Sequence, residues 1–140
     1  MNTPPPKTDP GLALDGPNRI LSLHQGESEA IASAAQKRER RIVDVALDGL
    51  TDKAQILDAL AQRFDMPRWF GHNWDALYDC LTDLSWLPAK GYVLILTNAA
   101  PDTCAAPILT DLLTDCCEHW QDRGVPFHVF AQTARSADAA

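Results

Sequence analysis

The sequence predicts an α/β domain in which a small three-stranded parallel sheet packs with three to four helices. Three short apolar runs, at residues 42–47, 92–96 and 126–130, have the composition of strands. The segments between them place apolar residues at helical spacing. Strands that alternate with helices favour right-handed crossover connections, and therefore a parallel sheet.

The first 40 residues precede this pattern. Five of the ten prolines fall within the first 17 residues, so we expect residues 1–18 to form a disordered tail. Residues 19–40 form an extension with one helix, because good helix formers over residues 28–39 end in a basic cluster. A short apolar patch at residues 20–23 comes before that helix.

We expect the domain itself to span residues 41–131. Thr51 is the candidate N-cap of its first helix, and the Met-Pro pair at residues 66–67 ends that helix. Asn73 is the candidate N-cap of the next helix, which runs to about residue 84.

The run at residues 92–96 is apolar without interruption, which is typical of a strand covered on both faces at the centre of a sheet. A long helix over about residues 103–123 follows, with Pro107 in its first turn and Gly124 as its C-terminal stop. We expect residues 132–140 to form a flexible tail.

The net charge is concentrated in the domain. Residues 41–131 hold six basic and thirteen acidic side chains, so the net charge of -7 arises there. Such a surface repels the phosphates of nucleic acid and attracts a basic protein, whose encounter it accelerates at low salt. We therefore expect a basic protein partner and no direct binding to nucleic acid.

The sequence also favours a cytoplasmic location. No stretch is apolar over the ~18 residues that a membrane span needs, and the first residues lack the apolar segment of a secretory signal. We expect the protein to be a monomer. We also expect its cysteines to be reduced, because two of the four fall at apolar helical positions and an adjacent pair does not resemble a disulfide framework. The cysteines are Cys80, Cys104, Cys116 and Cys117.

Asp75, Asp79 and Asp83 are four residues apart, so on a helix they would form one acidic stripe. Like charges at this spacing destabilise a helix by roughly 0.2–0.5 kcal/mol per pair. Asp75 lies near the predicted N-terminus, where an acid complements the helix dipole, whereas Asp79 has no such reason. The residues alone leave two explanations open, a solvated face or a binding surface.

The four tryptophans divide into two groups. Trp74 and Trp120 fall on apolar helix faces and are expected in the core. Trp69 and Trp86 flank the acidic helix in or near loops, where a large aromatic residue can anchor a partner.

The sequence offers little support for catalysis or for a metal. It contains no glycine-rich phosphate loop, no G-x-S-x-G elbow and no C-x-x-C motif. His72 and Asp75 have the spacing of an acid–base pair, but equally of a capping arrangement. Cys116 and His119 have the spacing of a metal pair, yet no second pair completes four ligands. We therefore expect no enzyme, metal or cofactor, and a hydrolase that uses His72 is the least favoured hypothesis.

Residues 67–82, PRWFGHNWDALYDCLT, resemble the barstar family of intracellular ribonuclease inhibitors. The resemblance consists of a proline, two aromatic residues, a glycine and an asparagine, followed by Asp-Ala-Leu, an aromatic residue and Asp-Cys-Leu-Thr. The predicted elements over residues 41–131 also come in the order of that family.

The resemblance implies that this loop and helix plug the active site of a small, basic bacterial ribonuclease. Asp79 matches the central acid, which takes the place of the substrate phosphate, and Asp75 matches a second acid. Trp69 stands where the family has a tyrosine that packs on the catalytic histidine, and Tyr78 replaces a tryptophan at the rim. Together with the added Asp83 and the neighbouring Trp86, the expected partner-binding residues are Trp69, Phe70, Gly71, Asn73, Asp75, Tyr78 and Asp79.

Two questions stay open at this point. A further acid of the family, on the long helix, falls near His119 in this chain, with Glu118 one residue away. The alternative function is a regulatory interaction module that binds a partner other than a nuclease, through residues 1–40.

Overall fold

The computed structural model describes residues 10–24, 26–47, 50, 52–68, 70–99 and 106–133. These residues form one four-stranded sheet, four α-helices and a short 3-10 helix. In chain order the elements are η1 (Pro10–Asp15), β1 (Ile20–Ser22), α1 (Ser28–Lys37), β2 (Arg41–Ala46), α2 (Lys53–Arg63), α3 (Trp74–Leu81), β3 (Tyr92–Ala99), α4 (Ala106–Asp122) and β4 (Phe127–Thr133).

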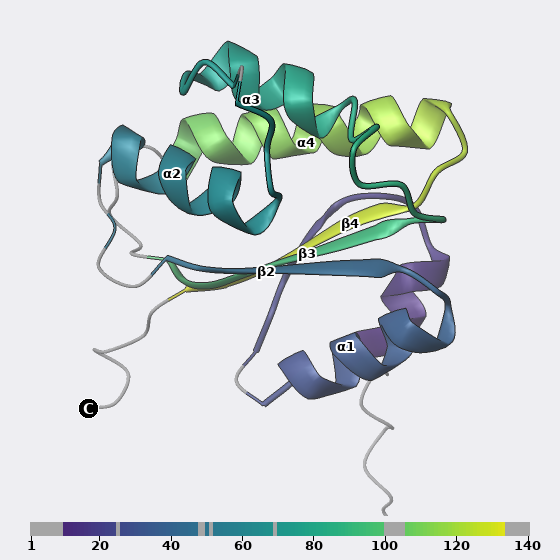
Figure 1. Ribbon diagram of the computed structural model, residues 1–140. Coiled ribbons are helices and arrows are strands. Elements are labelled where there is room, and N and C mark those ends of the chain that lie inside the picture. The colour runs from purple at the N-terminus through teal and green to yellow at the C-terminus, as the bar shows by residue number, and fades with distance from the viewer. Residues whose placement is uncertain are drawn as a thin grey trace, which may run out of the picture.

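The sheet is parallel throughout, with the strand order β1-β4-β3-β2. One face is covered by α2, α3 and α4, and the other face by η1 and α1 (Figure 1). The predicted α/β class and the parallel sheet are confirmed. The predicted number of strands, three, is wrong, because the sheet has four.

β1 is the strand that the sequence did not predict. Ile20 is the register partner of Val129, so β1 lies at the edge of the sheet beside β4. Hydrogen bonds at its two ends hold it there, from the backbone N–H of Val129 to Arg19 at 3.1 Å and from that of Leu23 to Ala131 at 2.8 Å. A three-residue strand is shorter than the roughly four to eight residues over which alternation can be recognised.

Residues 10–18 also differ from the prediction, because they are ordered and do not belong to a disordered tail. Leu14 of η1 is only 1% exposed. Asp15 accepts two hydrogen bonds of 2.8 Å from the guanidinium of Arg38, which fastens η1 to the end of α1. Two leucines in a proline-rich segment carry no periodic signal, so the sequence does not show that Leu14 is buried whereas Leu12 is exposed. Residues 1–9 lie outside the described part.

The two faces of the sheet carry separate hydrophobic cores. On β3, Leu94 and Leu96 belong to the core under α2, α3 and α4. Val93 and Ile95 alternate with them and belong to the core under η1 and α1. This alternation confirms the prediction that the apolar run at residues 92–96 is an interior strand covered on both faces.

α2 begins differently from the prediction. The predicted cap, Thr51, lies outside the described residues. The side chain of Asp52 accepts a hydrogen bond from the backbone N–H of Gln55 at 2.9 Å and is the observed N-cap. The helix ends at Arg63, shortly before the Met-Pro pair.

α4 begins at Ala106 and ends at Asp122, close to the predicted end, while the predicted start at about residue 103 lies outside the described residues. Pro107 lies in its first turn, where the missing N–H costs no helical hydrogen bond. Gly124 follows the helix with a positive φ of 71°, a conformation that favours glycine. β4 then continues to Thr133, so residues 134–140 are the part of the expected tail that lies outside the described residues.

Among the described residues, no helix combines the length and the apolar character that crossing a bilayer requires.

Candidate functional site

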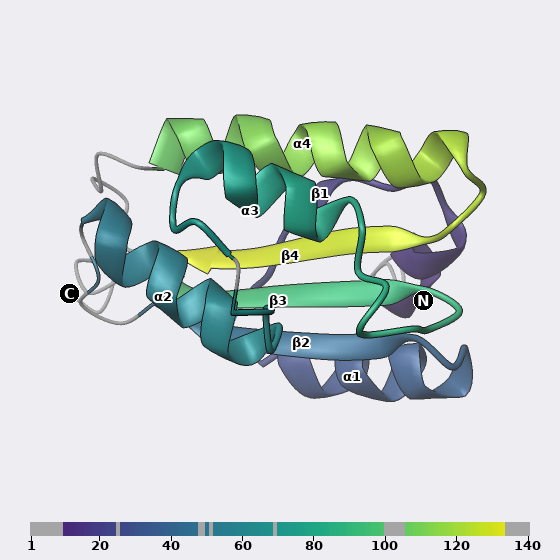
Figure 2. The same cartoon turned by 45° about the horizontal axis from the view of Figure 1, so that its top comes forward.

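α3 has one buried side and one displayed side. Its N-cap is Asn73, as predicted, whose side chain accepts a hydrogen bond from the backbone N–H of Ala76 at 2.7 Å. The helix lies along α4 (Figure 2). Three of its side chains are fully buried: Leu77, Cys80 and Leu81. Asp75 and Asp79 are therefore held on the exposed side of a short, firmly anchored helix.

α3 ends at Leu81, before the predicted end, and this changes the position of Asp83. Leu84 has a positive φ of 52°, and its side chain is 1% exposed. The chain turns sharply to bring this leucine into the core, so Asp83 lies in the turn and not on the helix. The prediction of one continuous stripe of three aspartates is wrong, because only Asp75 and Asp79 share a helical face.

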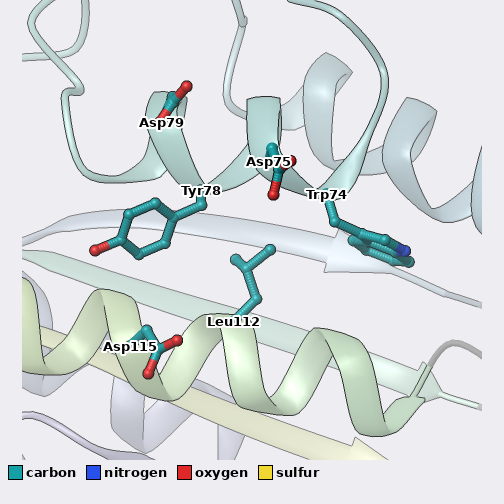
Figure 3. A pocket seen from close by; sticks show the side chains of 6 residues that line it. All are labelled: Trp74, Asp75, Tyr78, Asp79, Leu112 and Asp115. Carbon is teal, nitrogen blue, oxygen red and sulfur yellow. The ribbon is translucent and has the colours of Figure 1, made fainter.

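A groove of about 430 Å³ opens between α3 and α4 (Figure 3). Three carboxylates line it, from Asp75 and Asp79 of α3 and from Asp115 of α4. The remaining lining residues are Trp74, Tyr78 and Leu112. The groove therefore combines negative charge with apolar and aromatic surface.

Asp115 was not among the residues predicted from the sequence. A signal existed, because Asp111, Asp115 and Asp122 recur near helical spacing and all three are exposed. The repeat does not show which side of α4 meets α3, so it could not place Asp115 beside Asp79. Only the packing of the two helices brings these carboxylates into one groove.

The carboxylates of the groove are not neutralised by salt bridges. The ion pairs found among the described residues lie elsewhere, and none includes Asp75, Asp79 or Asp115. Burial raises the pKa of the Tyr78 phenol, and the carboxylates of Asp115 and Asp79 act in the same direction, while the charge of Arg123 opposes them. Tyr78 therefore presents a neutral hydroxyl beside these carboxylates.

The predicted aromatic contacts are divided between surface and core. Trp69 lies outside the described residues. Phe70 is 5% exposed and belongs to the main core, so its side chain is not displayed on the surface, and its contact with a partner stays a prediction. Trp74, which was expected in the core, is half-buried and lines the groove. Trp120 is in the core, as predicted, where its indole N–H donates to the carbonyl of Leu81 at 2.8 Å.

Trp86 does not line the groove. Its indole N–H donates to the carbonyl of Phe64 at 2.8 Å, so it fastens the segment after α3 to the end of α2. Gly71 and Asn73, in contrast, are exposed next to the start of α3. The residues that the structure gathers around α3 are thus a subset of those predicted, with Trp74 and Asp115 added.

His72 does not pair with Asp75. Its Nε2 lies 3.2 Å from a carboxylate oxygen of Asp58 in α2, and its ring packs on Phe70 with 4.7 Å between the centroids. The cap of α3 is Asn73 and not His72. The pair of His72 and Asp75 is therefore not formed, and the aspartate that lies beside His72 is Asp58.

His119 and Glu118, the two candidates for the family's further contact on α4, differ in their surroundings. His119 is half-buried with its ring edge against Trp120, and its Nδ1 lies 3.3 Å from a guanidinium nitrogen of Arg123. Burial lowers the pKa of His119, and the charge of Arg123 acts in the same direction. Glu118 is exposed, but it does not line the groove.

No metal site is formed by the residues that the structure describes, since no three His, Cys, Asp or Glu side chains gather in the required way. Cys80, Cys116 and Cys117 are buried and free, and burial raises the pKa of each thiol. Their environment is that of small hydrophobic residues in a core. Cys104 lies outside the described residues.

Comparison with protein families gives a match. Residues 40–132, well over half of the chain, match the family model described as Barstar (barnase inhibitor). The matched region runs from just before β2 to near the end of β4, and excludes η1, β1 and α1. No curated protein matches the chain.

Proposed function

The chain belongs to the barstar family of ribonuclease inhibitors, and from this premise we propose that it blocks the active site of a small basic ribonuclease with α3 and the loop before it. The observation that carries the proposal is the exposed side of an anchored helix, α3, where Asp75 and Asp79 form no salt bridge with any other described residue. Asp79 is the central contact and Asp75 the second.

The chemistry of such an inhibitor is mimicry of the substrate. A carboxylate that sits where a phosphate would bind can accept paired, charge-assisted hydrogen bonds from an arginine. Close charge pairs at such an interface can contribute several kcal/mol of coupling. The inhibitor needs no catalytic group of its own, because it occupies the active site and excludes RNA.

The surroundings of α3 support this use. Gly71 and Asn73 are exposed at the start of the helix, where a partner's loops can reach the backbone. Phe70 and Trp86 contribute indirectly, because they fix the segments on either side of α3 to the core and to α2. We propose that Trp69 and Tyr78 supply aromatic contacts and that Asp83 lies at the rim. The biological role would be immunity, that is, protection of a cell from the ribonuclease that it makes.

The experiment is an inhibition assay. Barnase, and any small basic ribonuclease captured by the chain from its host, should cleave RNA more slowly when the protein is in excess. Asp79→Ala should weaken binding by at least ~2 kcal/mol, or about 30-fold, because it leaves the partner's cations buried and unpaired. The readout is the inhibition constant of each variant.

Asp44→Ala is the matched control. It removes the same charge from an exposed position in β2, a strand at the sheet edge away from α3. We expect it to leave the inhibition constant nearly unchanged. If every such nuclease cuts RNA at full rate in excess protein, or if Asp79→Ala inhibits as well as the unmodified chain, the proposed function is wrong.

A further inference from the structure

We propose that His72 is a positioning residue for the partner-binding loop. This loop comprises residues 70–73, which lead into α3, and His72 bridges it to Asp58 of α2. The bridge holds Gly71 and Asn73, two of the expected contacts, in the conformation that the ribonuclease meets. The inference rests on the proposed function and names a pair of residues outside α3 on which the strength of inhibition depends.

The backbone of His72 has an uncommon conformation. Its φ is 53°, in the left-handed region that residues with a Cβ atom rarely adopt. The other described non-glycine residues with a positive φ are Glu39, Asp65 and Leu84, and each comes shortly after the end of a helix, where this conformation is common. His72 instead precedes a helix. Such a conformation persists where its surroundings determine it, and it concentrates at functional sites.

Three contacts hold the ring of His72. Nδ1 lies 3.2 Å from the carbonyl oxygen of Phe70, and Nε2 lies 3.2 Å from a carboxylate oxygen of Asp58. The ring also packs on that of Phe70, with 4.7 Å between the centroids. Both polar neighbours are hydrogen-bond acceptors, so a protonated ring donates to both and a neutral ring donates to one of them.

Both attachment points of the ring belong to well-packed parts of the domain. Phe70 is buried in the main core. α2, which carries Asp58 on its exposed side, is anchored to the core by three buried side chains. These are Ile56, Leu57 and Leu60. The ring of His72 therefore connects an exposed stretch of loop to the scaffold on which it lies.

The residues on either side of His72 form a compact turn. The side-chain amide of Asn73 donates to the carbonyl of Gly71 at 3.3 Å, and its oxygen accepts from Ala76 as the cap of α3. Gly71 and Asn73 are both exposed. A loop that already has its bound conformation loses less conformational entropy when a partner docks. His72 and Asp58 therefore strengthen binding without contacting the ribonuclease themselves.

The bridge has little effect on global stability, because it is exposed. The side chains of His72 and Asp58 are 55% and 64% exposed, and ion pairs of this kind contribute little to the free energy of unfolding. Its loss should therefore appear in the affinity for the partner and in the order of the loop. This distinguishes a positioning role from a purely structural one.

The first test is a double-mutant cycle on inhibition, with barnase and any ribonuclease that the chain captures as the enzymes. Asp58→Ala and His72→Asn should each raise the inhibition constant about threefold or more, because the loop must then be ordered on binding. Asparagine is chosen because it tolerates a positive φ and is shorter than histidine. The double variant should inhibit no less well than the weaker of the two single variants.

Asp58→Asn is the matched control for charge. It removes the same charge as Asp58→Ala but keeps a side-chain oxygen that accepts a hydrogen bond from Nε2 of His72. It should therefore restore most of the inhibition that Asp58→Ala loses. If Asp58→Asn inhibits as weakly as Asp58→Ala, the effect comes from charge and the inference is overturned. Effects of Asp58→Ala and His72→Asn that multiply in the double variant also overturn it, since the two residues then act independently.

Asp79→Ala separates this inference from the proposed function. If Asp79→Ala weakens inhibition and neither Asp58→Ala nor His72→Asn does, the inference is overturned and the inhibitor function stands. If the unmodified chain inhibits no ribonuclease, the proposed function is overturned, and a measurement on the free protein decides whether His72 holds the loop.

That measurement is ¹⁵N relaxation, which needs no nuclease. The backbone amides of Gly71, His72 and Asn73 should have order parameters of about 0.85, as in a rigid backbone, and these should fall toward about 0.6 in Asp58→Ala. Asp58→Asn should keep them high, and the amides of β3 should change in neither variant. A thermal melt should give nearly the same midpoint for all three proteins. Unchanged order parameters in Asp58→Ala overturn the inference.

Discussion

Asp79 lies where its negative charge is unfavourable for the free chain. It lies in the second half of α3, four residues after Asp75, where a like charge and the negative end of the helix dipole both oppose it. The like charge costs roughly 0.2–0.5 kcal/mol and the helix dipole roughly 0.3–1 kcal/mol. Neither is offset by a salt bridge among the described residues. An acid in this position is best explained by the cations of a partner.

His128 is a residue of a different kind, because its chemistry acts on stability. It lies in β4 and is fully buried, with Nε2 3.2 Å from the carbonyl oxygen of Gly16. Nε2 therefore carries the proton and donates it. Nδ1 is buried and has no hydrogen-bond partner among the described residues. The charged groups that influence the ring or are influenced by it are Arg19, Arg40 and Asp15.

We predict that the free energy of unfolding falls as the pH drops below about 6.5, the ordinary pKa of histidine. Burial lowers the pKa of His128 in the folded chain, and the charges of Arg40 and Arg19 add to this, while the carbonyls of Gly16 and Pro17 oppose it. The unfolded chain therefore takes up a proton at a higher pH than the folded chain. Stability that is present above this range is lost as the pH falls through it.

Urea denaturation at several pH values between about 7.5 and 5 measures this slope. His128→Gln, which cannot titrate, should flatten it. His119→Gln is the control, since the pKa of His119 is also lowered but its side chain is only half-buried. A slope in His128→Gln as steep as that of the unmodified chain would contradict the prediction. Asp15 does not contribute to this slope, because its pKa is lowered and it therefore changes the free energy of unfolding only at more acidic pH.

At the scale of single elements, α3 depends on its cap. The helix has only eight residues, so an unsatisfied first turn is a large fraction of its hydrogen bonding. Asn73→Ala should lower the free energy of unfolding by about 1 kcal/mol, whereas Asn73→Ser, which keeps an acceptor, should lower it much less. Urea denaturation of the free protein measures both changes, independently of any partner. If Asn73→Ala and Asn73→Ser have the same free energy of unfolding, the side-chain cap does not stabilise α3.

How much of each element could be predicted depends on where its determinants lie. The cap at Asn73, the first-turn Pro107 and the stop at Gly124 are local, so the sequence located them correctly. The end of α3 depends on Leu84, which adopts a strained φ because the core accepts its side chain. No sequence pattern within the helix predicts that it ends at Leu81, so the sequence analysis placed Asp83 on the helix when it lies in the following turn.

The candidate site was predictable only on one helix. Asp75 and Asp79 follow from helical spacing and from the family motif, and both are exposed on α3. The groove requires knowledge of how α3 and α4 pack, which brings Asp115 beside them. The same applies to β1, whose three residues become a strand through pairing with β4.

At the scale of the whole molecule, the two faces of the sheet differ in what they carry. The face under α2, α3 and α4 carries the candidate site, and the opposite face carries a second core formed with η1 and α1. The family match covers the first layer and the strands β2, β3 and β4, and it begins after β1 and α1. The N-terminal layer, of which η1 and α1 are part, covers the opposite face of the sheet and lies outside the matched region.

We predict that this layer contributes to stability without contributing to inhibition. Ile31 of α1 is 0% exposed, so Ile31→Ala should lower the free energy of unfolding by about 2–5 kcal/mol through lost burial and the cavity that remains. Ser33→Ala, at an exposed position of the same helix, should change it by less than about 0.5 kcal/mol. Below the unfolding transition, both variants should inhibit a susceptible ribonuclease as well as the unmodified chain.

The same layering decides how an interaction through residues 1–40 must be tested. Deleting them would expose Val93, Ile95 and Phe130 to water, so a lost interaction could reflect unfolding alone. Substitutions on the exposed side of α1, such as Glu29→Ala and Lys37→Ala, leave that core intact. If such variants abolish binding of a partner that Asp79→Ala leaves bound, the N-terminal layer is itself a binding surface.

If Ile31→Ala weakens inhibition while the protein is folded, the two layers are coupled, and the prediction that the N-terminal layer does not contribute to inhibition is wrong.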